Sequence, residues 1–385
     1  MTDTLLVYHR PDGRVAIRNF MAVISASDAA NPVARRLAGS VPEAVAITPL
    51  YGRGQLGEDF ALSVRTMVGL GTNPNVYAVL VVGLEPVAAE RIAQGIARTG
   101  KRVEVLSIQK EGGTPRLFGH GSQILHAWAG KAAHIRRQPA TLAELSVGLE
   151  CGGSDTTSGL VANPAIGLVA DRLIDAGGTA IFSEPVECLG GEAILSARTK
   201  DKKVTREIVR TIKKYEVIAQ RAGVDLNRTN PAPDNIRGGL TTIEEKSLGS
   251  ISKSGSRPIR GVLAYGQAPP RPGLYLMDAP APATENITAL AAAGVQVILF
   301  GTGVGNSIGN PVVPTIKVCG NPVTCRTLGT HIDVDLSAVI TRGLDLTVAA
   351  DRVQAALLKV VEGKRTRCEV LGETETAISR IGPSV

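Results

Sequence analysis

Residues 76–82 read Val-Tyr-Ala-Val-Leu-Val-Val, a nearly unbroken run of aliphatic and β-branched side chains. A run this short and this apolar is typical of a strand buried on both faces of a sheet. Around it, strands are expected at 20–26, 45–48 and 103–108, and helices at 31–38, 60–70 and 87–98. Because strands and helices alternate, this part of the chain is predicted to form a parallel doubly wound sheet.

The pattern breaks near residues 136–141 and again in the Pro- and Asn-rich stretch 230–237. The predicted fold class is therefore α/β. A Rossmann-like lobe is expected at 1–138, followed by one or two further α/β lobes at 139–229 and 230–385. Within these, strands are expected at 145–149, 179–182, 261–264, 295–300 and 315–319, and helices at 163–175, 201–222, 285–293 and 349–361.

The composition excludes several classes of protein. The chain of 385 residues carries a net charge of +7, but only 3% of its residues are aromatic and its basic residues are spread out, so nucleic-acid binding is not expected. A positive field instead favours a small anionic substrate. No apolar run of 18 residues predicts a membrane span. Five cysteines without a CxxC pair, in a chain without a recognisable secretory signal, predict reduced thiols and a cytoplasmic location.

Two glycine-rich polar blocks stand out, at 151–155 and 233–249. This composition suits loops that hold polar groups in fixed positions. Cys151 is expected to follow a strand and to precede a helix beginning near Ser154 or Asp155, and the helix N-terminus is expected to lower the pKa of its thiol. Cys151 is then a candidate metal ligand or nucleophile. The alternative is a small buried residue in a glycine-rich turn.

Three other segments carry candidate chemistry. A predicted loop holds the carboxylates Glu184, Glu187 and Glu192, which suit a hard cation or acid–base catalysis, or form a plain surface cluster. Arginines in 8–20 suit carboxylate recognition, or belong to an ordinary surface turn. Arg53 lies in a predicted strand-to-helix loop that either binds an anion or only connects the two elements.

Residues 300–309 (FGTGVGNSIG) form a glycine-rich loop after a predicted strand. Such a loop can approach a phosphate or another anion closely. The spacing differs from the dinucleotide fingerprint, and Pro311 and Pro314 prevent the helix that the fingerprint requires. No nucleotide cofactor is therefore expected.

These blocks together resemble the altronate/galactarate dehydratase family, which also includes sulfolactate sulfo-lyase large subunits. The resemblance covers most of the chain and rests on the stretches RPDGRVAIRN (10–19), CGGSDTTSGLVANPAIG (151–167), GGTAIFSEPVECLGGE (177–192), PDNIRGGLTTIEEKSLGSISKSG (233–255) and FGTGVGNSIGNPVVPTIKVCGN (300–321). It implies a hydro-lyase that catalyses β-elimination from a hydroxylated carboxylate such as a sugar acid, with iron as the associated metal.

The resemblance also implies roles for individual residues. Those implied to be catalytic are Glu184, Glu187, Lys246, Lys253 and Asp155. Those implied to bind a divalent metal are Cys151, Glu184, Glu187 and Glu192. Those implied to bind substrate are Arg14, Arg18, Asn19, Arg53, Ser154, Asn163, Asp234, Asn235, Thr302, Gly303, Lys317 and Asn321.

The chain departs from the family pattern in ways that affect these expectations. Family cysteines are missing at Asn310 and near Leu336, Arg53 and Leu84. Fe²⁺ is therefore expected with fewer sulfur ligands, and Mg²⁺ or Mn²⁺ held by oxygen atoms is the alternative.

The first family block starts close to the beginning of the sequence, so the small SAF-type domain of many relatives is expected to be a separate partner subunit. A homo-oligomer is also expected. The competing hypotheses are a non-catalytic relative that has lost its metal and a nucleotide-dependent oxidoreductase.

Overall fold

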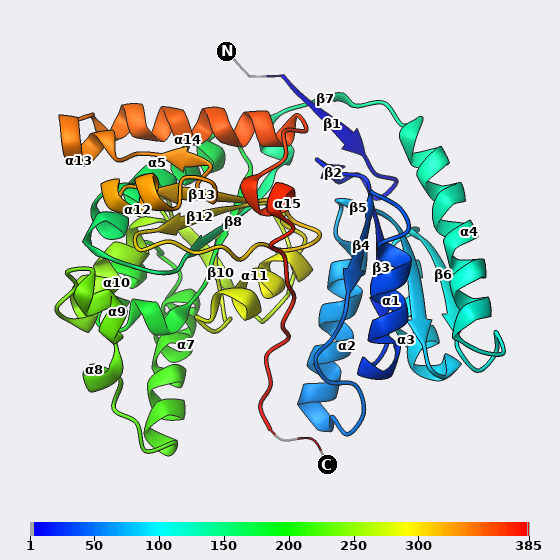
Figure 1. Cartoon of the computed structure of the whole chain (residues 1–385). Coiled ribbons are helices and arrows are strands. Elements are labelled where there is room, and N and C mark those ends of the chain that lie inside the picture. The colour runs from blue at the N-terminus through cyan, green and yellow to red at the C-terminus, as the bar shows by residue number, and fades with distance from the viewer. Residues whose placement is uncertain (1–3, 383, 385) are drawn as a thin grey trace.

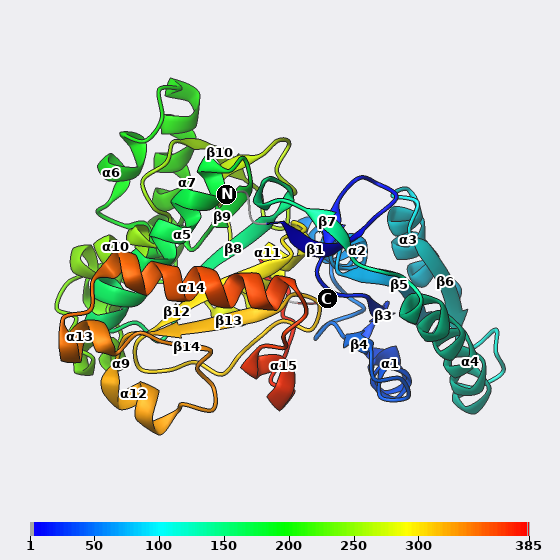
Figure 2. The same ribbon diagram turned by 90° about the horizontal axis from the view of Figure 1, so that it is seen from above.

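The computed structural model describes residues 4–382 and Ser384, in which two α/β lobes lie side by side (Figures 1 and 2). The first lobe has a four-stranded parallel sheet in the order β4-β3-β5-β6. Its elements are β3 (Phe20–Ser25), α1 (Asn31–Ala38), β4 (Ala44–Ile47), α2 (Gly57–Thr72), β5 (Val76–Gly83), α3 (Pro86–Ala97), β6 (Arg102–Ser107) and α4 (Thr114–Ala133). The predicted parallel doubly wound lobe is confirmed.

Strand β5 shows why residues 76–82 determine this fold. Ala78, Leu80 and Val82 pack into a cluster with side chains of α1 and α4. Val79 and Val81 alternate with them and pack on the opposite face with side chains of α2 and α3. Because both faces are covered by helices, neither can be polar, and the sequence of the strand is apolar throughout.

The second lobe is built on a seven-stranded parallel sheet in the order β10-β11-β9-β8-β12-β13-β14. Its strands are β8 (Ser146–Cys151), β9 (Thr179–Phe182), β10 (Ile259–Leu263), β11 (Gly273–Met277), β12 (Val297–Thr302), β13 (Thr315–Cys319) and β14 (Val334–Asp335). Strands from both sides of the predicted boundary at 229/230 share this sheet, so the structure has one further α/β sheet where the sequence allowed one or two lobes. The residue limits of the domains stay a prediction.

Helices cover both faces of the second sheet. The longer ones are α5 (Asn163–Asp175), α7 (Lys202–Arg221), α10 (Ile243–Ser252), α11 (Ala283–Ala292) and α14 (Leu346–Val361). The shorter ones are α6 (Glu192–Ser196), α8 (Leu226–Thr229), α9 (Pro233–Arg237), α12 (Pro322–Thr327), α13 (Ala338–Arg342) and α15 (Arg367–Leu371), with single helical turns at Asp28–Ala30, Leu142–Glu144, Ser158–Ala162 and Pro185–Cys188. No helix in the described part of the chain combines the length and apolar character that a bilayer span requires.

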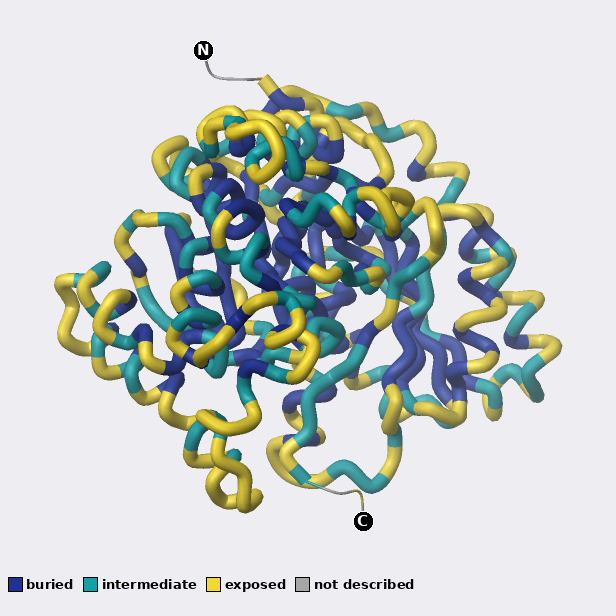
Figure 3. Tube along the Cα trace, turned by 60° about the vertical axis from the view of Figure 1, so that its left-hand side comes forward, coloured by how far each residue is buried: buried dark blue, intermediate teal, exposed yellow. Residues whose placement is uncertain are grey.

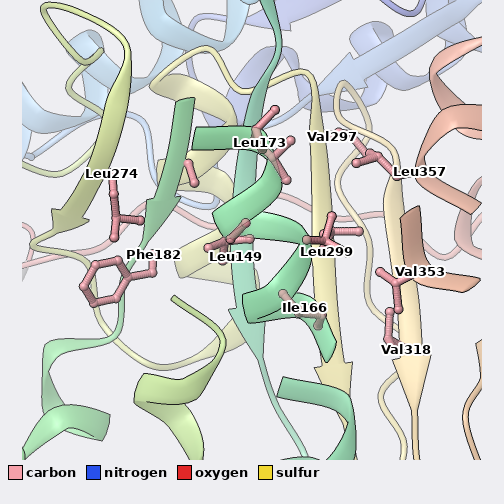
Figure 4. Close-up of a cluster of buried hydrophobic side chains, with 14 of the residues drawn as sticks. Leu149, Ile166, Leu173, Phe182, Leu274, Val297, Leu299, Val318, Val353 and Leu357 are labelled. Atoms are coloured by element: carbon pink, nitrogen blue, oxygen red, sulfur yellow. The ribbon is translucent and has the colours of Figure 1, made fainter. Parts of the chain in front are cut away.

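The main core of the second lobe lies between its sheet and helices α5 and α14 (Figure 4). Leu149 and Leu299 come from the neighbouring strands β8 and β12, and Ile166 and Val353 from the covering helices. Each such side chain contributes about 1.5–3 kcal/mol through burial. This packing fixes β8 and β12, whose carboxyl ends carry the candidate site.

A second core is shared by the two lobes (Figure 3 shows the buried segments). It combines Ile24 and Leu70 of the first lobe with Leu290 and Ile298 of the second. The Asn73 side chain donates hydrogen bonds to the carbonyls of Ala291 and Val295 at 2.8 and 3.0 Å. The lobes are therefore packed together by buried contacts.

Two further segments join the lobes. A small antiparallel sheet in the order β2-β1-β7 combines β1 (Leu5–His9), β2 (Val15–Ala16) and β7 (Gln138–Ala140). The C-terminal segment, red in Figure 1, runs between the lobes. Its backbone N–H groups at Ile381 and Gly382 donate to the Asp59 carboxylate of α2 at 2.6 and 2.8 Å.

The sequence did not predict α4 or β11, and the loop expected at 233–249 is wrong, because α9 and most of α10 lie there. Helix α4 contains Gly119, Gly121 and Gly130, which interrupt its apolar period. Strand β11 lies in a proline-rich stretch, and that composition indicated a loop.

Candidate functional site

The candidate site lies where the winding of the second sheet reverses, between β8 and β12. Chain order runs from β8 outward to β9 on one side and then returns to β12 on the other. In open α/β sheets, ligands bind at the carboxyl ends of the strands beside this reversal.

Glycines allow the two loops at the reversal to approach each other closely. Gly152 N donates to Gly301 O at 3.1 Å, and the N–H groups of Gly303 and Val304 both donate to Gly153 O at 2.9 Å. Gly153 has φ +66°, and a Cβ there would lie 2.6 Å from a carbonyl oxygen. A side chain at that position would separate the loops, so the glycine-rich composition keeps the carboxyl ends of β8 and β12 together.

A buried cluster surrounds the ammonium group of Lys253 at this edge. The Lys253 Nζ donates to Glu184 Oε2 at 2.7 Å, to Ser250 Oγ at 2.8 Å and to Cys151 Sγ at 3.1 Å. The Lys253 and Glu184 side chains are each only 1% exposed. Cys151 ends β8, Glu184 follows β9, and Lys253 follows α10, so packing of three separate elements assembles the cluster.

Glu150 is a member of this cluster that the sequence did not indicate. It is 0% exposed and accepts a hydrogen bond from the Asn286 side chain of α11 through Oε2, while its Oε1 has no hydrogen-bond partner. Ser183 Oγ supports Asn286 by donating to its Oδ1 at 2.5 Å. In the sequence, Glu150 is one charged residue inside an apolar strand, and only the contacts across the sheet reveal its position.

The charges of the cluster balance when one carboxyl group is protonated. Burial and then the neighbouring Glu184 raise the pKa of Glu150 well above its usual value. Burial opposes the charge on Lys253, but the acidic groups around it, Glu184 among them, outweigh burial and raise the pKa of that amine well above its usual value. Lys253 is therefore a cation at neutral pH. Burial raises the pKa of Glu184 as well, but the Lys253 charge 2.7 Å away opposes that rise, so Glu184 is the carboxyl group that the cation favours as an anion and Glu150 the one favoured as an acid. Two carboxyl groups held in different protonation states are typical of an acid–base centre.

The expected lowering of the Cys151 pKa is wrong. Burial and then the neighbouring Glu184 raise the pKa of the Cys151 thiol. The following helix begins at Thr156, beyond the glycine turn. The thiol therefore lacks the exposure and the nearby helix terminus that would make it a thiolate.

Glu184 has a left-handed backbone conformation, with φ 64° and ψ 58°. For a residue other than glycine this costs about 1–3 kcal/mol, and such residues cluster at functional sites. The conformation brings the Glu184 carboxylate back to the end of β8, where it accepts from Cys151 N at 3.3 Å.

A second ion pair lies closer to solvent. Lys246 Nζ is 3.1 Å from Glu187 and also donates to Asn230 Oδ1 at 2.7 Å. The Lys246 and Glu187 side chains are 11% and 12% exposed. The negative charge of Glu187 is close enough to Glu184 to help raise the pKa of that carboxyl group, after burial. The Lys246–Glu187 pair therefore lies between the buried cluster and the surface.

Asp155 organises the loop beside the cluster. Its Oδ1 accepts from Ser158 N and Thr157 Oγ1, both at 2.8 Å, and its Oδ2 accepts from the Asn321 side chain at 2.7 Å. A Cβ on Gly303 would lie 1.9 Å from Asp155 Oδ1, so this close contact requires glycine. Asp155 connects the loops after β8, β12 and β13.

Other predicted residues lie around the same loops. Asn235 Nδ2 donates to Ser154 O at 2.9 Å, and Asn163 Nδ2 donates to Gly249 O at 2.9 Å. Thr302 Oγ1 accepts from the backbone N–H of Gly305 at 3.1 Å. Lys317 is fully buried on β13, whereas Asp234 is exposed at the start of α9.

Several predicted residues lie outside this assembly. Arg18 forms a bidentate ion pair with Glu369 of α15 at 2.8 and 2.9 Å. Arg14 binds Asp12 and the carbonyl of Thr72. Asn19 follows Arg18 in the same segment, and Arg53 is exposed after β4. Glu192 begins α6. Arg14 and Arg18 support the packing of the chain, and the substrate roles of all these residues stay predictions.

The predicted metal ligands do not form a metal site in this arrangement. Lys253 supplies the positive charge between Cys151 Sγ and Glu184 Oε2, and Glu187 faces Lys246. A metal also needs Cys151 as a thiolate, whereas burial keeps the thiol protonated. Among the described residues, no group of three or more His, Cys, Asp or Glu side chains is arranged to hold a metal ion.

Comparison with known proteins gives consistent matches along the chain. Residues 142–384 match the family described as D-galactarate/Altronate dehydratase, C-terminal, and residues 7–133 match D-galactarate dehydratase/Altronate hydrolase, second domain. The chain is 40% identical to (2R)-sulfolactate sulfo-lyase subunit beta of Chromohalobacter salexigens, covering 98% of this chain and 97% of the relative.

Two further relatives come from Escherichia coli K12. Altronate dehydratase is 32% identical, with 98% of this chain and 77% of the relative covered. Galactarate dehydratase (L-threo-forming) is 31% identical, with 78% and 59% covered.

Proposed function

Because the chain belongs to the D-galactarate/altronate dehydratase family, whose characterised members named above are lyases, we propose that it catalyses β-elimination from a small hydroxy acid. The observation that carries the proposal is the buried Glu184–Lys253 pair at the reversal of the second sheet, 2.7 Å apart. A buried carboxylate beside a fixed positive charge suits removal of a proton from carbon, because the anion that forms can be stabilised where it arises.

The proposed reaction takes place on adjacent carbons of a 2-hydroxy acid. A base takes the proton from C2, the C2–H electron pair forms the C2–C3 double bond, and the leaving group departs from C3 with its own electron pair. The product is an enol, which tautomerises to a 2-oxo acid. The enzyme therefore needs a base near C2 and positive charge for the anion that develops on the carboxylate.

We assign the base to Glu184 and the stabilising charge to Lys253. Lys253 has a raised pKa and stays protonated, so it cannot accept the C2 proton. We assign the ionised state to Glu184, because the Lys253 charge opposes the effect of burial on its pKa, and the proton to Glu150, whose pKa burial raises well above its usual value. This division leaves one acceptor and one cation next to each other, as the reaction requires.

We assign the binding of the substrate carboxylate to Lys246, which shares with Lys253 the stabilisation of the negative charge that develops during the reaction. Its ammonium group lies nearer to solvent than Lys253 and is paired with Glu187 at 3.1 Å. An incoming carboxylate can replace Glu187 as its partner. Loss of this contact is expected to weaken substrate binding and to misplace C2 relative to Glu184.

The leaving group has two candidates. Hydroxide would be the leaving group if the chain acts as the dehydratases of the family do. Sulfite would be the leaving group if it acts as the sulfo-lyase relative does, and that relative matches this chain at 40% identity over nearly its whole length. The same removal of the C2 proton serves both, so the site proposed here does not depend on the choice. Detection of sulfite together with a 2-oxo acid distinguishes sulfite release from dehydration.

Incubation with (2R)-sulfolactate, altronate and galactarate tests the proposed function. We expect a 2-oxo acid from one of these substrates, with (2R)-sulfolactate as the preferred one, and a turnover at least about tenfold lower in Lys246→Met. A Lys246→Met protein with full turnover would remove that lysine from the mechanism. Failure of the native protein on all three substrates, with and without a second subunit, would contradict the proposed reaction.

A divalent metal, Fe²⁺ or else Mg²⁺ or Mn²⁺, stays a prediction, and no step above depends on it. Metal analysis of protein purified without oxygen or chelators tests it, beside Cys151→Ala. Stoichiometric metal that is lost in the variant would make Cys151 a ligand and would require Lys253 to move away from the thiol. Stoichiometric metal that is unaffected would place it on oxygen ligands.

We also propose a separate small subunit of the SAF type, because the relative that matches over 97% of its length is itself a subunit. Five large aliphatic side chains are exposed on the helices and loops near Asp155 and would contact this subunit: Leu160, Ile236, Leu248, Val304 and Val323. These loops are joined by bonds such as Thr156 N to Gly238 O and Asn321 to Asp155. Full turnover by this chain alone would contradict the partner.

A further inference from the structure

Two of the five cysteines lie together at one edge of the candidate site. Cys319 ends β13, and Cys325 follows in α12. Cys325 Sγ is 3.5 Å from the carbonyl oxygen of Cys319, and Cys319 Sγ is 3.9 Å from the carbonyl oxygen of Asn321, which also accepts from Cys325 N at 2.9 Å. The turn at 319–321 therefore brings the two side chains together, and their thiols are hydrogen-bonded to each other.

The two thiols differ in their access to solvent. Cys319 is 0% exposed, and its Sγ donates to the carbonyl oxygen of Gly303 in the loop after β12 at 3.6 Å. Cys325 is only partly buried, and the next residue in α12, Arg326, is exposed. A reagent in solution therefore reaches Cys325 first, and Cys319 meets only what is already bound to Cys325.

The two thiols also differ in how firmly they hold a proton. The hydrogen bond from Cys325 lowers the pKa of Cys319, although burial opposes this effect. The bond to Cys319, and then burial, raise the pKa of Cys325, and Asp335, which is opposite Cys319 in the β13–β14 ladder, adds to the rise. The pair thus loses one proton readily and keeps the other between its two sulfur atoms. An accessible thiol beside a ready thiolate is the arrangement that thiol–disulfide exchange needs.

The other three cysteines have the character of inert thiols. Cys151, Cys188 and Cys368 are all buried, with exposed fractions of 4% or less. Burial raises the pKa of each of these thiols, to about 12 for Cys188 and about 11 for Cys368. Buried cysteines in their protonated form react slowly with reagents in solution.

We propose that Cys319 and Cys325 are a redox-active pair that a low-molecular-weight disulfide, such as oxidised glutathione, converts into an intramolecular disulfide. The shared proton moves to Cys319, and the Cys325 thiolate attacks one sulfur atom of the reagent. A disulfide between Cys325 and glutathione forms, and the first glutathione leaves and takes up the proton from Cys319. The Cys319 thiolate then attacks the Cys325 sulfur, and the second glutathione leaves as a thiolate. The two cysteine sulfurs are oxidised, the two glutathione sulfurs are reduced, and no other reactant is consumed.

The disulfide closes a ring that contains Asn321, a residue that connects α12 to the candidate site. Asn321 Oδ1 accepts from Val323 N at 2.8 Å, and Asn321 Nδ2 donates to Asp155 Oδ2 at 2.7 Å. Oxidation also removes the thiol proton that Cys319 donates to Gly303 O. Both contacts belong to the loops that Asp155 connects, so the redox state of the pair acts on the edge of the site. Reversible disulfides in proteins of reducing compartments are commonly catalytic or redox-sensing.

Mass spectrometry of the full-length protein after incubation with oxidised glutathione tests the proposal. Cleavage by trypsin after Lys317 and Arg326 gives the peptide 318–326, whose only cysteines are the two of the pair. We expect this peptide to lose two hydrogen atoms within hours and to regain them with dithiothreitol. Its thiols are expected to react at least about tenfold faster than the three buried ones.

Serine variants test the order of the two steps. Cys319→Ser is expected to stop at the first step and to keep one glutathione on Cys325. Cys325→Ser is expected to leave Cys319 unmodified, because no reagent reaches it. Cys368→Ser provides the matched control, a buried cysteine outside the pair, and is expected to form the 319–325 disulfide as the native protein does. Far-ultraviolet circular dichroism checks that each variant is folded.

Three results would overturn the proposal. Native protein whose 318–326 peptide keeps both thiols, or reacts no faster than the three buried cysteines, would show that the pair is not redox-active. Native protein that accumulates glutathione on Cys325 without forming the ring would show that Cys319 does not reach it. A folded Cys325→Ser protein modified at Cys319 as fast as native protein is modified would show that Cys325 is not the point of entry.

Discussion

Replacing Lys253 with methionine tests whether the buried cluster is a balanced set of charges. The Nζ–Oε2 distance to Glu184 is 2.7 Å and both side chains are 1% exposed, so water cannot compensate for a lost partner. In Lys253→Met, Glu184 keeps the Cys151 N–H at 3.3 Å and a long contact with the Cys151 thiol at 3.9 Å. Removing one partner of a buried ion pair costs about 3–5 kcal/mol, and we expect the free energy of unfolding to fall by that amount.

The double variant Lys253→Met/Glu184→Gln is the decisive comparison. It removes both charges and keeps similar volumes, so its free energy of unfolding is expected to lie within about 1–2 kcal/mol of the native value. The deficit of the single variant Lys253→Met is also expected to shrink as the pH is lowered, because Glu184 then becomes neutral by taking up a proton.

Urea unfolding at pH 7, followed by far-ultraviolet circular dichroism, measures these differences. The exposed pair Lys110–Glu90 provides the control, with side chains 64% and 45% exposed, and Lys110→Met is expected to cost under about 1 kcal/mol. A loss below about 1 kcal/mol in Lys253→Met would refute the charge balance, since breaking a buried ion pair by removing one partner costs about 3–5 kcal/mol. The charge balance would also be refuted if the double variant lost as much free energy of unfolding as the two single variants lose together.

Three further predictions concern single positions. Burial lowers the pKa of Lys317 from 10.5 to about 8, which means that its buried charge destabilises the folded protein by about 3 kcal/mol at pH 7. Lys317→Met removes this cost and also removes the contact of the ammonium group with the Phe300 ring, worth about 1–2 kcal/mol. Thermal unfolding at pH 7 should therefore show that the variant is more stable than the native protein by about 1–2 kcal/mol. Between pH 8 and 10.5 the native protein should become more stable relative to Lys317→Met, because Lys317 releases its proton at a lower pH in the folded than in the unfolded state. The same dependence of stability on pH in both proteins would contradict this. Gly303→Ala places a Cβ 1.9 Å from Asp155 and should lower the unfolding midpoint sharply, whereas Gly119→Ala in the open part of α4 should raise it slightly; equal midpoints would contradict the close packing. Arg18→Met should lose stability through its bonds to Glu369 and leave KM unchanged, and a large rise in KM would return Arg18 to the substrate site.

Local patterns predicted most of the fold, because the buried strands are continuous apolar runs. The helix at 163–175 and the strands at 179–182 and 315–319 have the same limits in the structure as in the sequence prediction. The sequence could not show that strands on both sides of 230 share one sheet, since pairing partners across a sheet leave no local signal. For example, β11 pairs with β9 across about 90 residues of intervening chain.

The candidate site was predictable only in part. The glycine-rich blocks and the resemblance identified Cys151, Glu184 and Lys253, but their mutual contacts span 102 residues of sequence between Cys151 and Lys253. Glu150 gave no signal, because a single charged residue at a strand end usually faces solvent. Arg18 has the residue type of an anion ligand, yet it binds Glu369, which lies 351 residues later. Which charged groups become partners is decided by the tertiary fold.

The central claim is that Glu184 removes the C2 proton, and the rate of exchange of that hydrogen for deuterium in heavy water tests it most directly. Native protein and Glu184→Gln are compared with (2R)-sulfolactate, together with the rate of 2-oxo acid formation, and Glu90→Gln serves as an exposed control. We expect both rates to fall by at least about 100-fold in Glu184→Gln, the usual contribution of a general base, and to stay unchanged in Glu90→Gln. Rates in Glu184→Gln within about threefold of the native protein, a difference of under about 1 kcal/mol in the barrier, would contradict the assignment of Glu184 as the base.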